Sequence, residues 1–455
     1  MNDVPCPSSP GSAGLVSRLP GGALVDLVDP AANALRGISV EEARRLLTEA
    51  PPEALRELRG SFALVARQGT TVRMARSLDR PLRYFLAKRA EGPALFVASR
   101  MDELFHALQK EGLEDQFHPT YTRMVPAHHV VELQLVGCPD PEPTYRRFFD
   151  PERGTLGTDL DAIGRAYVGA LADEIGDWVA SLPAREPVGV SFSGGVDSGA
   201  VVLLLYHQMK ALGMNLGRLK AFTLSFGDGA DLAQARAFLA ALGLELLLEP
   251  VEASLDGLDV DEALGVVEDY KPLDVESASM AIALCRGIRE RYPEWRHLAD
   301  GDGGDENLKD YPVEANPELT IRSVVSNPML YQEGWGVGKL KHSATYSGGY
   351  SRSVTRSFAP ARRFGFLPYS PYTSPRVVAV AEAIPFDSLT AGSTRRLYAL
   401  KGEVVARGVK AITGHDLPVF EKRRFQHGAI SEERLREKVP AHEGELRRRF
   451  LALYR

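Results

Sequence analysis

Two hydroxyls, two glycines and one carboxylate fall within six residues of this chain, as S-G-G-V-D-S over 193–198. The preceding run V-G-V-S-F is short and mostly apolar, as in a buried parallel strand, and the apolar run after the loop is long enough to begin a buried helix. A turn between a strand and a helix start presents free N–H groups and the positive end of the helix dipole, which favour an anion. The hydroxyls can donate to phosphate oxygens, and Asp197 can hold Mg²⁺.

This loop differs from the common phosphate-binding loop, because it has no G-x-x-x-x-G-K-[ST] pattern and no lysine in the turn. It resembles the pyrophosphate-binding loop of the N-type ATP pyrophosphatases, which cleave ATP between the α- and β-phosphates. The alternative is an ordinary glycine-rich strand–helix turn with an Asx cap. The resemblance implies contacts with pyrophosphate from Ser193, Gly194, Gly195, Asp197 and Ser198.

A second polar loop follows an apolar strand-like segment and reads D-G-D-G-G-D-E over 300–306. Carboxylates this close repel one another unless a cation offsets them, and ligands of open α/β sheets bind at strand ends. We therefore expect Asp197 and Asp305 to share Mg²⁺ on the β- and γ-phosphates of ATP. A solvated acidic turn is the alternative, and the missing D-x-[DN]-x-[DN]-G spacing argues against a calcium loop.

Together, the two loops resemble the synthetase domain of the asparagine synthetase family, which includes β-lactam and carbapenam synthetases and lasso-peptide cyclases. Similar segments cover roughly 185–430, including 368–382, 397–405 and 418–428. The resemblance implies ATP and Mg²⁺ as cofactors, adenylation of a substrate carboxylate with release of pyrophosphate, and attack of an amine on the acyl-adenylate.

Further site residues follow from the same resemblance. It implies an adenine contact near Leu224, a nucleotide contact at Gly301, a catalytic Lys401 that stabilises charge in the transition state, and a pyrophosphate contact at Lys422. The alternatives are a helix-surface position for Lys401 and a solvated basic turn around Lys422.

The residue at position 302 and the segment 268–279 bear on the two substrates. Asp302 stands where asparagine synthetases carry Glu or Asp and β-lactam-forming members carry Tyr, which implies help in deprotonating the amine and disfavours β-lactam formation. Segment 268–279 corresponds to the family's acceptor pocket but departs from the asparagine synthetase pattern. Residues 317–366 are predicted to form either a substrate lid or a packed helical face with an arginine rim. Candidate contacts with the carboxylate substrate are Tyr270, Lys271, Asp274 and Glu276.

The periodicity predicts an α/β fold with two domains after a flexible leader. From residue 160 helical and strand patterns alternate, which predicts a doubly wound parallel sheet, followed by a mainly helical C-terminal part. One of the alternating helices is predicted over 278–292. Strand-like segments between polar turns over about 20–145 predict a small, mostly antiparallel domain. The predicted boundaries are 1–20 for the leader, 21–150 for the small domain and 155–455 for the ATP-pyrophosphatase domain.

The small domain resembles the later part of the family's glutaminase domain but lacks its chemistry. The family's nucleophile is a cysteine directly after Met1, where this chain has Asn2, and Arg59 and Ser77 stand where the family has aspartates. Cys6 would need removal of five residues before its α-amine could act as base. We predict a degenerate, Ntn-like remnant without glutaminase activity, which covers a face of the synthetase domain, so that ammonia or another amine is the nucleophile.

Composition argues against several other classes of function. A net charge of −6 gives no broad nucleic-acid surface, three scattered cysteines give no C-x-x-C metal or redox motif, and no apolar run reaches membrane-spanning length. We expect a cytoplasmic protein with small-molecule carboxylate and amine substrates, no membrane or nucleic-acid partner, and a homodimer left open. An amide ligase or cyclase of peptides or specialised metabolites, a tRNA-modifying or sulfur-transferring ATP pyrophosphatase, and a non-catalytic ATP-binding scaffold are the alternatives.

Overall fold

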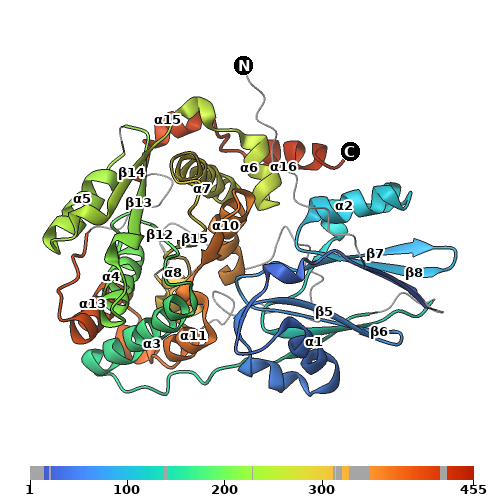
Figure 1. The fold of residues 1–455 in the computed structure, drawn as a ribbon, viewed down its shortest axis with the longest axis horizontal. Helices are drawn as coiled ribbons and strands as arrows, with labels where there is room; N and C mark the ends of the chain where they lie inside the picture. Colours follow the sequence, from blue (N-terminus) through green and yellow to red (C-terminus); the bar gives the residue numbers. More distant parts are fainter. Residues whose placement is uncertain are drawn as a thin grey trace. The chain divides into compact units, whose positions relative to one another are not determined.

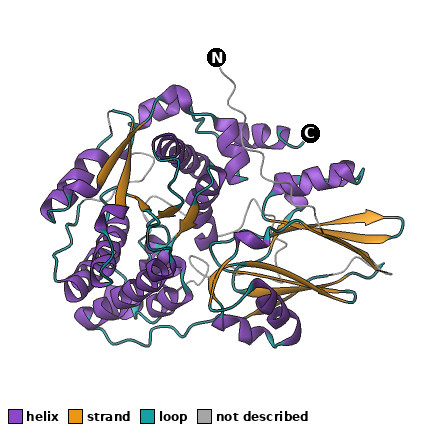
Figure 2. Cartoon of the chain, in the orientation of Figure 1, coloured by secondary structure: helices purple, strands orange, loops and turns teal. Residues whose placement is uncertain are grey.

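A computed structural model describes residues 15–19, 22–137, 142–227, 229–310, 313, 320–326, 349–420 and 428–455 (Figures 1 and 2). The chain divides into two compact units, with the change between Phe149 and Asp150. Cys6, Lys422 and much of the 317–366 segment lie outside the described residues. Within the described part, no helix has the length and apolar character needed to cross a membrane.

The N-terminal unit contains two main sheets whose apolar faces share one core. Strand pairs are antiparallel apart from β2 with β8, which is parallel. Leu24 and Leu95 of the first sheet and Val65 and Met74 of the second lie in the same buried cluster, as expected for two sheets packed face to face. The first sheet has the order β1 (Leu15–Leu19), β2 (Gly22–Asp26), β8 (Gly92–Ala98), β7 (Arg83–Arg89), β9 (Arg123–Met124), and the second β11 (Thr144–Arg147), β10 (His129–Gln134), β6 (Thr71–Arg76), β5 (Ala63–Gln68).

Shorter elements complete this unit. Helix α1 (Val40–Glu49) begins with a capping box, in which the Ser39 side chain and the Glu42 side chain each accept from the other residue's N–H. The other elements are α2 (Met101–Lys110) and the small ladder of β3 (Ala34–Arg36) with β4 (Arg59–Ser61).

One expectation for the N-terminal segment was wrong in part. Residues 15–19 were predicted to belong to a flexible leader, but they form β1, which pairs antiparallel with β2 from Leu15 opposite Asp26 to Leu19 opposite Gly22. The ladder of backbone hydrogen bonds orders a segment whose composition alone indicates a loop.

The second unit is built on a five-stranded parallel sheet, as the alternating pattern predicts. Its order is β14 (Leu248–Glu252), β13 (Leu219–Ser225), β12 (Val188–Ser191), β15 (His297–Ala299), β16 (Leu367–Tyr369), and neighbouring strands are parallel throughout. Because β12 and β15 are neighbours in register, with Val190 opposite Ala299, the loops that follow them leave the sheet at the same edge.

Helices pack around this sheet (Figure 1). Helices α3, α4 and α13 share one apolar core with Val188 and Val190 of β12, whereas α7 contacts β13 and β14 and contributes no residue to that core. The helices are α3 (Leu160–Ser181), α4 (Val196–Ala211), α5 (Asp231–Ala241), α6 (Val260–Val267), α7 (Pro272–Arg291), α8 (Gly304–Leu308), α9 (Ile321–Ser326), α10 (Gly349–Arg363), α11 (Pro375–Glu382), α12 (Phe386–Thr390), α13 (Thr394–Thr413), α15 (Glu432–Arg436) and α16 (Glu443–Ala452).

Helix α7 begins earlier than the apolar pattern indicates. The sequence predicts a helix from residue 278, but α7 starts at Pro272, because proline is favoured in the first helical turn, where its missing N–H costs nothing. The candidate acceptor segment is therefore largely the start of a buried helix.

Candidate active site

In the loop between β12 and α4, serine side chains form hydrogen bonds within the loop and with the start of α4. The Ser193 and Ser198 hydroxyls lie 3.3 Å apart, and the Gly195 N–H donates to the Ser193 hydroxyl at 3.3 Å. Helix α4 has sixteen residues and Gly195 at its N-cap, with no capping side chain. The first N–H groups of a helix lack intrahelical partners, so this end of α4 suits an anion.

Gly194 is required by the shape of this loop. Its φ of +74° belongs to the left-handed region, and a Cβ at this position would lie 2.9 Å from the backbone nitrogen of Ala235 in α5. The loop therefore packs directly on the backbone of α5, which fixes the turn.

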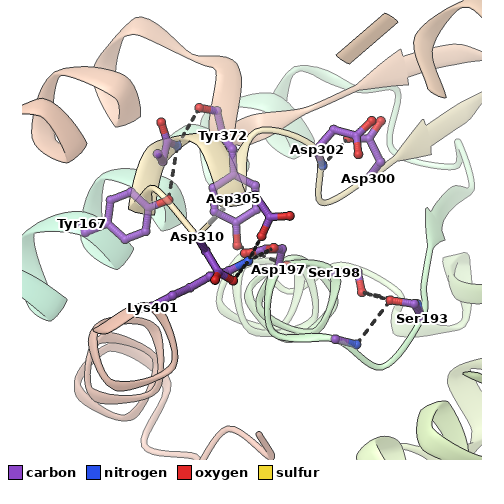
Figure 3. A network of polar contacts seen from close by, with 12 residues as sticks. Tyr167, Ser193, Asp197, Ser198, Asp300, Asp302, Asp305, Asp310, Tyr372 and Lys401 are labelled. Carbon is purple, nitrogen blue, oxygen red and sulfur yellow. Dashed lines mark hydrogen bonds and ion pairs between the residues drawn. The ribbon is translucent and has the colours of Figure 1, made fainter. Parts of the chain in front are cut away.

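The acidic loop after β15 packs against the start of α4 at similarly close range. A Cβ on Gly301 would lie 2.8 Å from the backbone nitrogen of Ser198 and 3.0 Å from Cβ of Asp197. The predicted nucleotide contact at Gly301 is thus part of the contact between the two loops. This approach brings Asp305, at the start of α8, beside Asp197 (Figure 3).

Lys401 of α13 connects the two loops. Its ammonium group donates to the carboxylates of Asp197 and Asp305, and Asp310 lies 3.6 Å away (Figure 3). The Lys401 side chain is 7% exposed and that of Asp305 is 40% exposed, so the cluster is accessible from the Asp305 side. Lys401 is therefore buried, so the helix-surface alternative is wrong, and its catalytic role stays a prediction.

The charge of Lys401 is stabilised by its surroundings. Burial alone would lower the pKa of Lys401, but the nearby carboxylates of Asp197, Asp305 and Asp310 outweigh this effect and hold its pKa well above the usual range. The lysine is therefore an ammonium ion at any physiological pH and can serve as a fixed positive charge.

A network of hydrogen bonds supports the backbone of Asp197. The Tyr372 hydroxyl donates to the Asp197 carbonyl oxygen at 3.1 Å, and Asn307 of α8 donates to the Tyr372 carbonyl oxygen at 3.0 Å and to the Tyr167 hydroxyl at 3.2 Å (Figure 3). Sequence reasoning missed these residues and Asp310. Tyr372 lies in the proline-aromatic segment 368–382, which was noted without a role for it, whereas Tyr167 and Asn307 had no distinguishing signal.

Asp302 lies on the same loop but faces a different set of groups. The Ser357 hydroxyl of α10 donates to the Asp302 carboxylate, and the Asp302 N–H donates to Asp300 Oδ1 at 3.0 Å. In Figure 3 Asp300 and Asp302 lie together, apart from Lys401 and its carboxylates. The loop thus supplies two distinct carboxylate groups.

The four candidate acceptor residues have different surroundings. Tyr270 is 1% exposed and packs against Phe450, which favours a structural role. Lys271 is the N-cap residue of α7. Asp274 and Glu276 are both buried and form ion pairs, with Arg356 of α10 and Arg436 of α15 respectively.

Of the remaining predicted contacts, Leu224 is described and Lys422 lies outside the described residues. Leu224 is buried near the end of β13, opposite Val251 of β14. Beyond that strand, the Phe226 N–H donates to the Ala429 carbonyl oxygen at 3.2 Å, which ties the C-terminal segment to this edge.

The donor set suits Mg²⁺ in company with phosphate. Asp197 and Asp305 are hard oxygen donors that one ammonium group already brings together. Among the described residues no group of three or more His, Cys, Asp or Glu side chains could hold a metal ion by itself. Mg²⁺ is commonly bound through one or two carboxylates plus substrate phosphates, so these two aspartates fit a magnesium–nucleotide complex.

Comparison with known proteins agrees with this geometry. Residues 170–362 match the family model described as asparagine synthase. The matched range contains the loop at 193–198, the acidic loop at 300–306 and helix α7, and it begins after the N-terminal unit. No curated protein matches the chain.

Proposed function

We propose that the protein is an AMP-forming amide ligase that uses ATP and Mg²⁺, because residues 170–362 match the asparagine synthase family model. A substrate carboxylate oxygen attacks the α-phosphorus of ATP, and the bond to the bridging oxygen breaks, so that pyrophosphate leaves. An amine nitrogen then attacks the acyl carbon of the adenylate, and AMP leaves. The observation that carries the proposal is the convergence of Asp197, Asp305 and Lys401 at the start of α4.

The chain's residues have separate tasks in this reaction. The 193–198 loop and the start of α4 donate N–H and O–H groups to the pyrophosphate. Asp197 and Asp305 would hold Mg²⁺, which would neutralise charge on the leaving group when bound. Lys401 supplies a buried positive charge where negative charge develops in the transition state, and such preorganised charges are worth roughly 10²–10³-fold in rate.

Access of the amine is proposed to occur at the Asp302 side of the acidic loop. Asp302 is half-buried, and its carboxylate would accept the proton that the attacking amine loses. Tyr270 lies just before α7, and the ion-paired Asp274 and Glu276 lie in its first turns. These residues would shape the pocket rather than bind the substrate carboxylate by charge.

The amine donor is proposed to be ammonia or another free amine rather than glutamine. Arg59 places a positive charge, and Ser77 an uncharged hydroxyl, where the resembled glutaminase domain has aspartates. The Ser77 hydroxyl accepts from the Phe62 N–H at 2.9 Å within the N-terminal unit. These features support the proposal that the N-terminal unit does not act on a glutamine amide.

The test is a survey of the full-length protein with ATP–Mg²⁺, a panel of amino acids and small carboxylic acids, and ammonium or glutamine as donor. We expect AMP and pyrophosphate to form with particular carboxylates, and an amide product to form with ammonium or another amine but not with glutamine. Equal product from glutamine and ammonium would contradict the proposed donor, and ATP turnover that ignores every carboxylate would contradict the ligase.

A further inference from the structure

We propose that Ser357 of α10 is a positioning residue that keeps Asp302 oriented as the proton acceptor for the attacking amine. The inference rests on the proposed ligase function and assigns a role to a residue and a helix that the sequence motifs leave without one. Its basis is the contact between α10 and the acidic loop, supported by the charges that surround Asp302.

The Ser357 hydroxyl lies between two carboxylates of the acidic loop. It donates to Asp302 Oδ2, and Oδ2 of Asp300 lies 3.4 Å from the same hydroxyl oxygen. The Asp302 N–H in turn donates to Asp300 Oδ1 at 3.0 Å. Asp300 thus holds the backbone of Asp302, and Ser357 holds its side chain. One serine hydroxyl thereby fixes the direction in which the free oxygen of Asp302 points.

The residue next to Ser357 is fixed by a second contact. Arg356 forms an ion pair with Asp274 of α7, and the Asp274 side chain is 1% exposed. Helix α10 also packs directly against α7. The position of Ser357 is therefore set by a buried anchor one residue away, which suits a residue that must hold another side chain still.

The groups around Asp302 shift its pKa in opposite directions. Burial raises the pKa of Asp302 well above its usual range, and the negative charges of Asp300 and Asp305 on its own loop add to this rise. The Ser357 hydrogen bond and the positive charge of Arg356 act in the other direction. Among the described residues, α10 thus supplies the groups that favour the carboxylate form of Asp302, while Asp274 of α7 holds Arg356 in place.

The ionised form matters because of the proton balance of amide formation. As the amine nitrogen forms its bond to the acyl carbon, the carbon–oxygen bond to AMP breaks and AMP departs with the electron pair. The nitrogen must lose a proton, which Asp302 accepts if it is a carboxylate and then returns to solvent. A protonated Asp302 cannot take this proton, so the amine-dependent step slows as pH falls through the pKa of Asp302.

Loss of the Ser357 hydroxyl should shift this titration. Hydrogen bonds to charged groups are strong enough that removing one from a carboxylate raises its pKa by about one unit. Ser357→Ala should therefore move the acid limb of the amine-dependent rate to higher pH by about one unit, with the rate recovering above that limb. Ser357→Thr retains a hydroxyl and should restore the wild-type profile.

The experiment measures the protonation of Asp302 directly and the pH profile in parallel. Infrared difference spectra of the full chain between low and high pH give the titration of Asp302, identified as the carboxyl band that is missing in Asp302→Asn. The matched control is Ser279→Ala, which removes a buried hydroxyl that donates to the Val275 carbonyl oxygen at 2.8 Å within α7.

The two readouts separate the inference from the proposed function. A rise in the titration midpoint of Asp302 in Ser357→Ala, absent in Ser279→Ala and in Ser357→Thr, supports the role of Ser357. An unchanged midpoint overturns it, whether or not the protein forms amides. Absence of carboxylate-dependent AMP formation in the wild type would overturn the ligase instead, and an amine-dependent rate whose acid limb stays in place despite a shifted midpoint would remove Asp302 as the proton acceptor.

Discussion

Lys401 contacts three carboxylates from two loops that are about a hundred residues apart in sequence, and it is almost fully enclosed. Removing a buried charge that has several partners is costly, because the remaining like charges then repel one another. Without a nucleotide, the ammonium group therefore stabilises an arrangement of Asp197 and Asp305 that Mg²⁺ and phosphate can use.

Replacing this lysine should destabilise the protein in a way that Mg²⁺ partly reverses. In Lys401→Met the free energy of unfolding should fall by about 3 kcal/mol, because Asp197, Asp305 and Asp310 lose their shared counter-charge. Added Mg²⁺ should then raise the melting temperature of the variant more than that of the wild type, since the cation takes over the charge of the missing ammonium group. Thermal and denaturant unfolding with and without Mg²⁺ measure both effects.

Lys410→Met, on the same helix, is the matched control. Lys410 is 53% exposed and pairs with Asp416 at 2.7 Å, and such surface pairs contribute about 0–1 kcal/mol. If Mg²⁺ stabilised Lys401→Met and the wild type equally, the two aspartates would not form the cation site assigned to them.

The individual residues differ in how far the sequence could reveal them. Asp197 and Asp305 are recognisable because dense polar loops follow apolar strands, and Lys401 is recognisable by family resemblance. Tyr372 and Ser357 each contribute one hydroxyl from a helical or turn segment that is distant in sequence from both loops, and no local sequence pattern distinguishes them. Their roles depend on tertiary proximity, which composition and spacing do not contain.

At the scale of elements, the site depends on parallel neighbours. Strands β12 and β15 lie side by side in one register, and this places two loops at one sheet edge although a long stretch of chain separates them. The alternation of strand and helix patterns was sufficient to predict such a sheet. The early start of α7 at Pro272 and the ordering of β1 were not predicted, because a helix's first turn and a short edge strand depend on packing more than on apolar periodicity.

The segment 371–373 that carries Tyr372 should influence activity more than stability. Tyr372→Phe and Tyr369→Phe each remove one hydroxyl that donates to a backbone carbonyl oxygen at 3.1 Å, of Asp197 and of Glu174 respectively. Both should lose about 1 kcal/mol of stability. Loss of support behind Asp197 should in addition reduce amide formation by about tenfold in Tyr372→Phe.

Parallel unfolding curves and initial rates of pyrophosphate release compare these two tyrosine variants. Equal activity losses in Tyr372→Phe and Tyr369→Phe would show that the hydrogen bond to Asp197 has no special part in the reaction.

At the scale of the whole molecule, the two units differ in how much of their function the sequence indicates. The second unit contains most of the matched family range, and its site motifs could be recognised from the sequence. The strands of the first unit were also predictable from their alternation, but its relation to a glutaminase domain rests on short segments, and the family match begins beyond it. Its proposed lack of glutaminase activity stays a prediction for the donor assay.

Global stability should show a pH dependence that originates at Lys309. Burial lowers the pKa of Lys309 to about 8, although the Glu382 and Asp387 carboxylates favour its charged form. In the unfolded chain a lysine has a pKa of about 10.4, so between these values the unfolded state binds more protons and the free energy of unfolding rises with pH. The contribution is about 3 kcal/mol over the full window.

The measurement compares denaturant unfolding of the wild type and of Lys309→Met between pH 7.5 and 10.5. The wild type should gain stability relative to the variant as pH rises through that window, and Lys309→Met should be the more stable form at the low end. A constant difference between the two proteins would mean that Lys309 titrates at its ordinary pKa in the folded state.

The central claim is that Asp197 and Asp305 serve the cleavage of ATP between its α- and β-phosphates. The most direct test is simultaneous quantification of AMP, pyrophosphate, ADP and phosphate during carboxylate-dependent turnover, in the wild type, Asp197→Asn and Asp305→Asn. We predict AMP and pyrophosphate in equal amounts from the wild type, with a loss of at least about 100-fold in each variant. ADP and phosphate as the products, or AMP formation that persists in both variants, would contradict the account.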